Sequence, residues 1–195
     1  LTELSDNVAS FEDELFRIEE YVSMALQYQR VSSTENDFVL EKVSVDGVIR
    51  DTIKKYAKIM IRRHIGINYS GTGQEVYTDV KWLAFMLEQI LSNAIKYTPK
   101  GSKICIRGMK CNGKAQICVE DNGPGIADEM KPYIFEMFYT GKSTIADSQR
   151  SLGLGLSLCQ SIIEAHDGRL LLTDNTPRGC IFTFTLPLSE VTLNE

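Results

Sequence analysis

The sequence has no run of the roughly 18 apolar residues that a membrane-spanning helix needs, and no signal peptide is evident at its start. Its 5 cysteines are odd in number and have no C-x-x-C spacing, so we expect neither a disulfide framework nor a zinc site. The net charge of −5 lacks the basic excess of nucleic-acid-binding proteins, so no nucleic-acid partner is expected. The chain also lacks an initial methionine, which indicates a region of a longer protein.

The first part of the chain carries a heptad pattern. Apolar residues recur at alternating spacings of four and three, with charged residues between them; they are Leu4, Val8, Phe11, Leu15, Ile18, Val22 and Ala25. This pattern predicts a helix packed along one seam, and we favour an intermolecular bundle over packing on the same chain. The polar run at 32–37 predicts a linker. We therefore expect a helical arm at 1–31, a domain at 38–188 and a tail at 189–195.

The rest of the chain alternates strand and helix patterns. The expected strands are 38–43, 65–69, a strand from Val76, 103–107, 115–120, 169–173 and 180–186. The expected helices are 45–60, a helix after Asp79 that ends before Pro99, a short helix at 128–134 and a helix at about 153–166. Asn112-Gly113 predicts a hairpin. The sum is an α+β fold, a mixed sheet packed on about three helices.

Two helix ends need an interpretation, because they contain the two histidines of the sequence. Arg62-Arg63-His64 and Glu164-Ala165-His166-Asp167-Gly168 both end a helical pattern. Cations in a last turn complement the negative end of the helix dipole, and a glycine closes many helices. We therefore expect both histidines to be structural.

A glycine turn follows the strand at 115–120, in the stretch Val119-Glu120-Asp121-Asn122-Gly123-Pro124-Gly125-Ile126. Gly123 and Gly125 let the backbone approach a ligand closely. A carboxylate at a strand end, here Asp121, can accept a hydrogen bond from the adenine amine. Surface turns use the same residues, so the stretch acquires meaning only with its partners.

One face of the helix before this turn is polar. Gln89, Asn93, Lys96 and Tyr97 follow one another at helical spacing. An amide oxygen suits Mg²⁺, an ammonium suits phosphate, and a tyrosine ring packs on a base or ribose. The alternative for such a stripe, if it stood alone, is a solvated helix face.

Two further stretches lie beyond the turn. Phe135 and Phe138, three residues apart, can anchor a hinge, and the run at 138–152 predicts a functional lid or disorder. Ser151-Leu152-Gly153-Leu154-Gly155-Leu156 then opens a helix, where exposed N–H groups suit phosphate.

Together these stretches resemble the asparagine box, the two glycine boxes and the phenylalanine box of the GHKL ATPases, a superfamily that includes gyrase, MutL and histidine kinases. Four segments are similar to those of sensor histidine kinases: QILSNAIKYTPKGSKI, VEDNGPGI, IFEMFYTGKS and SLGLGLSLCQSIIEAHDG. The resemblance covers 38–188, and the arm resembles the second helix of their dimerisation and phosphoacceptor bundle. Residues 77–98 resemble the kinases that sense bacitracin-like peptides, and the later boxes resemble potassium-sensing kinases.

The resemblance implies a two-layer α/β sandwich of the Bergerat type, the cofactors ATP and Mg²⁺, a homodimer through the arm, and a response regulator as partner. It implies a cytoplasmic region of a membrane-anchored bacterial protein. Asn93 would ligate Mg²⁺ and act in catalysis with Gln89, and Asp121 would bind the adenine amine. The residues implied to bind ATP are Asn93, Lys96, Tyr97, Asp121, Gly123, Gly125, Phe138, Lys142, Gly153, Leu154, Gly155 and Leu156, with Arg150 as a further phosphate contact.

The sequence departs from the family pattern in informative places. Gln89 stands where gyrase-like ATPases carry a catalytic glutamate, and a neutral amide cannot act as a general base for water, which favours phosphoryl transfer over hydrolysis. Ser151 replaces a glycine and Cys180 a threonine. We expect the phosphoacceptor histidine upstream of residue 1, so that this chain binds ATP without autophosphorylation. The alternatives are an ATP-hydrolysing clamp and a degenerate nucleotide-binding scaffold.

Overall fold

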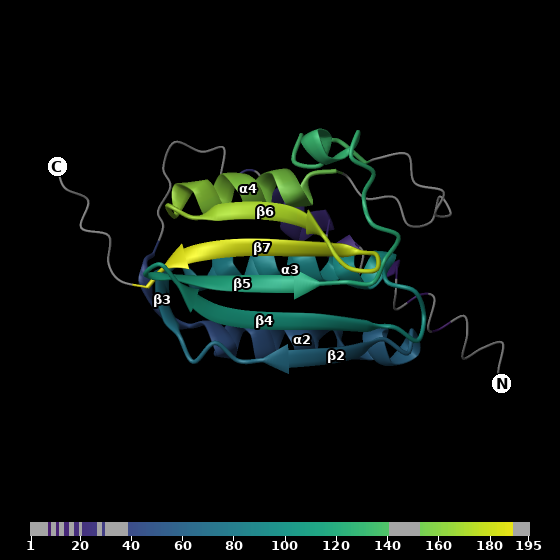
Figure 1. The fold of residues 1–195 in the computed structure, drawn as a ribbon, viewed down its shortest axis with the longest axis horizontal. Helices are drawn as coiled ribbons and strands as arrows, with labels where there is room; N and C mark the ends of the chain where they lie inside the picture. The colour runs from purple at the N-terminus through teal and green to yellow at the C-terminus, as the bar shows by residue number, and fades with distance from the viewer. Residues whose placement is uncertain are drawn as a thin grey trace.

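The computed structural model describes residues 39–140 and 153–188, together with helical residues scattered between 8 and 29. A sheet of five strands has the order β2-β4-β5-β7-β6, in which only the β2–β4 pair is parallel (Figure 1). Strands β1 and β3 form a separate antiparallel pair. The elements are β1 (Glu41–Ser44), α2 (Val45–Arg62), β2 (Gly66–Ser70), β3 (Glu75–Thr78), α3 (Val80–Tyr97), β4 (Lys103–Cys111), β5 (Lys114–Glu120), the 3₁₀ turn η1 (Lys131–Tyr133), α4 (Gly155–Ala165), β6 (Arg169–Asp174) and β7 (Cys180–Pro187).

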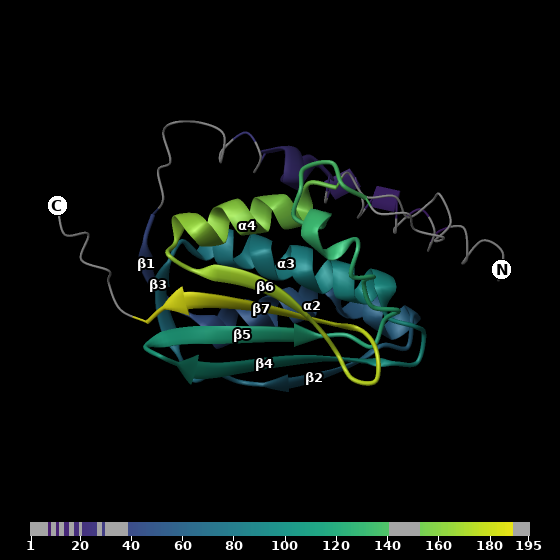
Figure 2. The same cartoon turned by 45° about the horizontal axis from the view of Figure 1, so that its top comes forward.

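Helices α2, α3 and α4 cover one face of the large sheet, as Figure 2 shows. Strand residues that alternate along β5 and β7 point into this layer, and Ile117 and Phe184 are fully buried there. Leu83 of α3 and Ile162 of α4 close the core from the helix side. Because the apolar stripe of each helix needs an apolar sheet face, the layers form the predicted α+β sandwich.

Local signals in the sequence set several boundaries as expected. The Asp79 side chain accepts a hydrogen bond from the Lys81 N–H (2.8 Å) and so caps α3. Asn112 and Gly113 have φ of 49° and 74°, the left-handed pair that a tight hairpin requires. Within the described residues, no helix is long and apolar enough to cross a membrane.

Three predicted boundaries differ from the structure. The helix predicted at 128–134 is wrong, because only the 3₁₀ turn Lys131–Tyr133 forms around Pro132, which lacks the N–H that a helix interior needs. The helix predicted from 153 begins at Gly155, since Gly153 has a φ of 69°. The first strand starts at Glu41 instead of at 38.

The end of α4 also differs from the prediction in one detail. The left-handed residue after this helix is Asp167, with a φ of 52°, and not Gly168. The Gly168 N–H still closes the helix by donating to the Ile163 carbonyl (2.8 Å). His166 is buried, with Nδ1 2.8 Å from the Ile162 carbonyl oxygen, as expected for a structural histidine.

The heptad positions of the arm that the structure describes are exposed. Six of the seven lie within the described residues and are helical, and Leu4 lies outside them; the six are Val8, Phe11, Leu15, Ile18, Val22 and Ala25. Phe11, for example, is 65% exposed, whereas Met24 on another side of the arm is buried. The apolar seam is therefore not covered by the described part of this chain.

We expect opposite stability effects from alanine at two glycines. A Cβ on Gly168 would lie 2.2 Å from the Thr185 carbonyl oxygen, so Gly168→Ala should lower the free energy of unfolding by about 1–3 kcal/mol. Gly47 in α2 has only ordinary contacts at 3.7 Å, so Gly47→Ala should raise it by about 0.5–1 kcal/mol. Urea denaturation measures both, and a neutral Gly168→Ala variant would contradict the close packing.

Candidate functional site

Asp121 lies just after β5 and is almost fully buried. Its Oδ1 accepts hydrogen bonds from the N–H groups of Gly123 (2.8 Å) and Cys180 (3.3 Å), and its own N–H donates to the Cys180 carbonyl (2.9 Å). No described residue donates to Oδ2. One oxygen of this buried carboxylate is therefore held by the protein, and the other remains available as an acceptor.

Glycines bring other backbone segments against Asp121. A Cβ on Gly123 would lie 2.8 Å from Asp121 Oδ1 and 3.1 Å from the Tyr97 carbonyl oxygen at the end of α3. A Cβ on Gly179 would lie 2.0 Å from the Asp121 carbonyl oxygen. Gly125 has a φ of 80°, and a Cβ on it would lie 3.7 Å from the Gly179 carbonyl oxygen. The glycine turn, the end of α3 and the β6–β7 connection thus meet at one carboxylate.

Asn175 holds this junction, and the sequence gives no indication of it. Its Nδ2 donates to the Asp121 carbonyl (2.8 Å) and lies 3.3 Å from Asn122 Oδ1, while its Oδ1 accepts from the Thr176 N–H (2.8 Å). The Asn-Thr-Pro sequence predicts only a turn between two strands. Its contact with Asp121 spans 54 positions, so no local signal could have found it.

The polar stripe of α3 is only partly exposed and meets the start of α4 at Gln89. Gln89 is buried, and a Cβ on Gly155 would lie only 2.4 Å from Gln89 Oε1, so the helix α4 begins directly against this amide. Asn93, Lys96 and Tyr97 are half-buried. Lys96 Nζ lies 5.2 Å from the centre of the Tyr97 ring. The stripe is therefore a partly covered surface and not a fully solvated helix face.

The start of α4 offers backbone donors. Leu154 precedes the first turn and makes no side-chain capping bond, so the first N–H groups of the helix have no acceptor from the cap residue. The Leu154 side chain is buried and the half-buried Leu156 packs against the core, which leaves backbone contact as their route to a ligand.

The two described ends of the predicted lid meet. The Phe138 N–H donates to the Gly153 carbonyl (2.8 Å), and a Cβ on Gly153 would lie 2.6 Å from the backbone of Phe138. The Phe138 side chain is 68% exposed, and its φ is 64°. Lys142 and Arg150 lie outside the described residues.

Burial governs the electrostatics of the site. Removal from water raises the pKa of Asp121, although the hydrogen bonds from Gly123 and Cys180 oppose this shift. Burial, together with the charge of Asp121, raises the pKa of the Cys180 thiol to about 12. Burial also raises the pKa of Tyr97. Both hydroxyl and thiol are therefore neutral at physiological pH.

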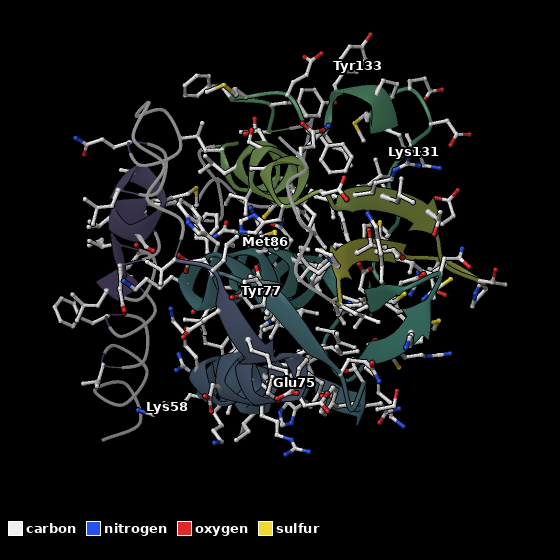
Figure 3. The ribbon with its side chains drawn as sticks, turned by 90° about the vertical axis from the view of Figure 1, so that its left-hand side faces the viewer. Lys58, Glu75, Tyr77, Met86, Lys131 and Tyr133 are labelled. Atoms are coloured by element: carbon white, nitrogen blue, oxygen red, sulfur yellow. The ribbon has the colours of Figure 1, made fainter. Side chains whose placement is uncertain are left out.

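Two salt bridges of Lys131 hold the segment that follows the glycine turn. Lys131 lies 2.6 Å from a carboxylate oxygen of both Asp128 and Asp174, which joins η1 to the end of β6. Lys131 and Tyr133 lie at the opposite edge of the molecule from α2 (Figure 3).

Among the described residues, no group of three or more histidine, cysteine or acidic side chains could hold a metal ion. On the α3 stripe, the amide oxygens of Asn93 and Gln89 are of the kind that can ligate a metal, and that of Gln89 lies against Gly155. Mg²⁺ commonly takes only one or two protein ligands and completes its shell with water and phosphate oxygens. The donor set therefore fits a metal that arrives with a polyphosphate.

The family model described as Histidine kinase-, DNA gyrase B-, and HSP90-like ATPase matches residues 78–190. Sensor protein BceS of Halalkalibacterium halodurans is 34% identical over 174 residues, which are 89% of this chain and 52% of that protein. The solved catalytic domain of histidine kinase ThkA has a TM-score of 0.67 at 27% identity and covers 76% of this chain and 95% of that domain. ThkA in complex with the response regulator protein TrrA has a TM-score of 0.72 at 26% identity and covers 91% of this chain and 49% of that one.

This chain belongs to the histidine kinase-, DNA gyrase B- and HSP90-like ATPase family. The predicted fold class and the resemblance to sensor histidine kinases are confirmed. The chain spans about half the length of the BceS relative that it matches.

We expect Asp121 to make stability depend on pH with a distinctive sign. Because burial raises its folded-state pKa, the stability that Asp121 contributes is present at low pH and lost as the pH rises through the raised value. Asp121→Asn keeps the Oδ1 acceptor without the charge. Its stability relative to wild type, measured by urea denaturation, should therefore increase from about pH 4 to pH 7.

Asp128→Asn provides the matched control. Lys131 lowers the pKa of Asp128, so the stability it contributes is present above the ordinary carboxyl range and lost as the pH falls. The stability of Asp128→Asn relative to wild type should therefore decrease as the pH rises through the carboxyl range. The same sign for both variants would contradict the assignment for Asp121.

Proposed function

We propose that this region binds ATP with Mg²⁺ and transfers the γ-phosphate to a histidine on a dimerisation bundle, for relay to an aspartate of a response regulator. The observation that carries the proposal is the buried Asp121 carboxylate. One of its oxygens is fixed by two backbone N–H groups, and the other is left for a donor such as the adenine amine.

The proposed roles of the surrounding residues follow from their positions. Asp121 reads the adenine amine, and Gly123 and Gly125 shape the turn around it. Tyr97 lies beside this turn, because a Cβ on Gly123 would lie 3.1 Å from the Tyr97 carbonyl oxygen. Lys96, directly before Tyr97 on α3, provides a cation that can pair with phosphate.

The phosphate end of the nucleotide is assigned to the junction of α3 and α4. The uncapped N-terminus of α4 supplies N–H donors and the positive end of a helix dipole, and the contact between Gly155 and Gln89 brings it against the α3 stripe. Gly153, Leu154 and Leu156 contribute there through their backbone. Phe138 and Lys142 complete the proposed set from the lid.

Asn93 would hold Mg²⁺ through its amide oxygen, and the bound ion would neutralise charge on the phosphates. Lys96 and the α4 N–H groups orient the same phosphates from the protein side. This division of labour suits phosphoryl transfer, in which positioning and charge neutralisation dominate over covalent chemistry.

Gln89 favours transfer over hydrolysis. A hydrolytic clamp needs a base to activate water, whereas Gln89 is a neutral amide enclosed against Gly155. The degenerate-scaffold alternative predicts damaged boxes and is disfavoured, since Asn93, Asp121 and the box glycines are all present.

The partners proposed for the whole protein are a second copy of this chain and a response regulator. The exposed heptad seam of the arm supports the homodimer, because an apolar stripe of this kind needs a helical partner. The complex of ThkA with a response regulator supports the second partner. The same proposal assigns this region to the cytoplasmic side of a membrane-anchored bacterial sensor.

Removal of the proposed ligands should weaken nucleotide binding. Asp121→Asn places an amide near the adenine amine and should raise the dissociation constant for Mg²⁺·ATP about 10–100-fold, the loss expected for a charge-assisted hydrogen bond. Asn93→Ala should raise it at least about tenfold in Mg²⁺ and have little effect in EDTA. Isothermal titration calorimetry measures both.

Asn68→Ala is the control for these variants, because Asn68 is exposed on β2 and makes no contact with the site residues. It should bind Mg²⁺·ATP as wild type does. If Asp121→Asn and Asn93→Ala also bound like wild type, the assignment of the site would be wrong.

Phosphoryl transfer is tested with a separate acceptor. The chain is incubated with γ-labelled ATP and a bundle that carries the phosphoacceptor helix of the BceS relative. We expect label on the bundle that is stable to base and labile to acid, at a rate well above that of ATP hydrolysis. His64→Ala, which removes the exposed histidine of this chain, should leave transfer unchanged. Hydrolysis without phosphohistidine would favour the clamp, and binding without either reaction would favour the scaffold.

A further inference from the structure

Arg63 follows the last residue of α2, but its side chain serves another helix. The sequence predicts that its charge complements the dipole of its own helix. In the structure the guanidinium donates hydrogen bonds to the carbonyl groups of Ile95, Lys96 (3.3 Å) and Thr98 (3.1 Å) at the end of α3. The last carbonyls of a helix have no N–H partner within the helix, so an arginine fork is well suited to them.

These carbonyls belong to the turn that carries part of the proposed site. Lys96 is one of the acceptors, and Tyr97 lies between two of them in sequence. The Tyr97 carbonyl lies close to Gly123, since a Cβ on Gly123 would be 3.1 Å from its oxygen, and the Gly123 N–H holds the Asp121 carboxylate. A path of hydrogen bonds and close backbone packing therefore runs from the Arg63 guanidinium through the end of α3 to the Asp121 carboxylate.

Among the described residues, the side-chain donors of Arg63 are used on the end of α3 alone. Within the described part of the chain, the guanidinium forms no ion pair with a carboxylate, and its side-chain hydrogen bonds all go to the three carbonyls. It is half-buried, and burial lowers its pKa. A fork with several donors can hold three acceptors at once, which the single ammonium of a lysine cannot do with the same geometry.

We propose that Arg63 is a positioning residue of the nucleotide site, because its guanidinium fixes the last turn of α3 and so sets Lys96 and Tyr97 relative to Asp121. This inference rests on the proposed function. It concerns a residue about 30 positions before the α3 box, on a different helix, which touches neither the glycine turn nor α4 through its side chain.

Arg63→Ala should raise the dissociation constant for Mg²⁺·ATP about tenfold, while the protein keeps its secondary structure and a cooperative thermal transition. Arg63→Lys should fall between wild type and Arg63→Ala. Millimolar guanidinium chloride should restore part of the affinity of Arg63→Ala, compared with sodium chloride at the same ionic strength. Lys58→Ala removes an exposed cation from the same helix and should change the affinity less than twofold, with no guanidinium effect.

A folded Arg63→Ala variant that binds ATP as tightly as wild type would overturn the proposal, because Arg63 would then only stabilise the fold. If Arg63→Ala does not fold, Arg63→Gln and Arg63→Lys replace it, and unchanged affinity in either folded variant would overturn the proposal in the same way. Affinity lost without any guanidinium rescue in Arg63→Ala also counts against a guanidinium role.

Hydrogen exchange separates failure of this inference from failure of the proposed function. If the wild-type protein binds no nucleotide, the proposed function fails, but the contact chain can still be tested. Arg63→Ala should then speed exchange of the Gly123 amide relative to wild type, whereas Lys58→Ala should not. Unchanged exchange at Gly123 would overturn the positioning role by itself.

Discussion

The buried carboxylate of Asp121 is the constraint on which the site depends. A charge removed from water needs hydrogen bonds, and two backbone N–H groups from different segments supply them to one oxygen. Both donors must approach closely, and neither segment could do so with a side chain at Gly123 or Gly179. The folded protein thus carries a carboxylate whose pKa burial raises, which is a cost that a binding site can offset through its ligand.

The glycines of the boxes have a common physical explanation in contacts between distant segments. The missing side chain of Gly123 leaves room for the end of α3. That of Gly155 leaves room for Gln89, and that of Gly153 for the backbone of Phe138. Each contact joins two stretches that stand apart in the sequence. The glycines of the boxes therefore allow distant segments of this fold to pack closely, in addition to any role in binding phosphate.

Helix α3 is held at both ends by residues outside it. At its start, Asp79 caps the helix through Oδ1 and accepts the Val39 N–H through Oδ2 (3.1 Å), which ties the entry of the domain to this helix. At its end, Arg63 holds the terminal carbonyls. A helix fixed in this way keeps Gln89, Asn93, Lys96 and Tyr97 in one register against the glycine turn.

The sequence by itself determined the sandwich, most element positions, the Asp79 cap, the Asn112-Gly113 hairpin and the family, because each depends on local patterns of apolar, capping and glycine residues. It predicted a helix around Pro132 where only a 3₁₀ turn forms. It also assigned the charge of Arg63 to the end of α2, whereas the guanidinium binds the end of α3. Only the tertiary structure decided that Asn175 and Arg63 support Asp121 and α3, that Leu154 is buried, and that Gly155 meets Gln89. These contacts join residues from about 30 to more than 60 positions apart, and the side chains involved carry no local signal of where the fold will take them.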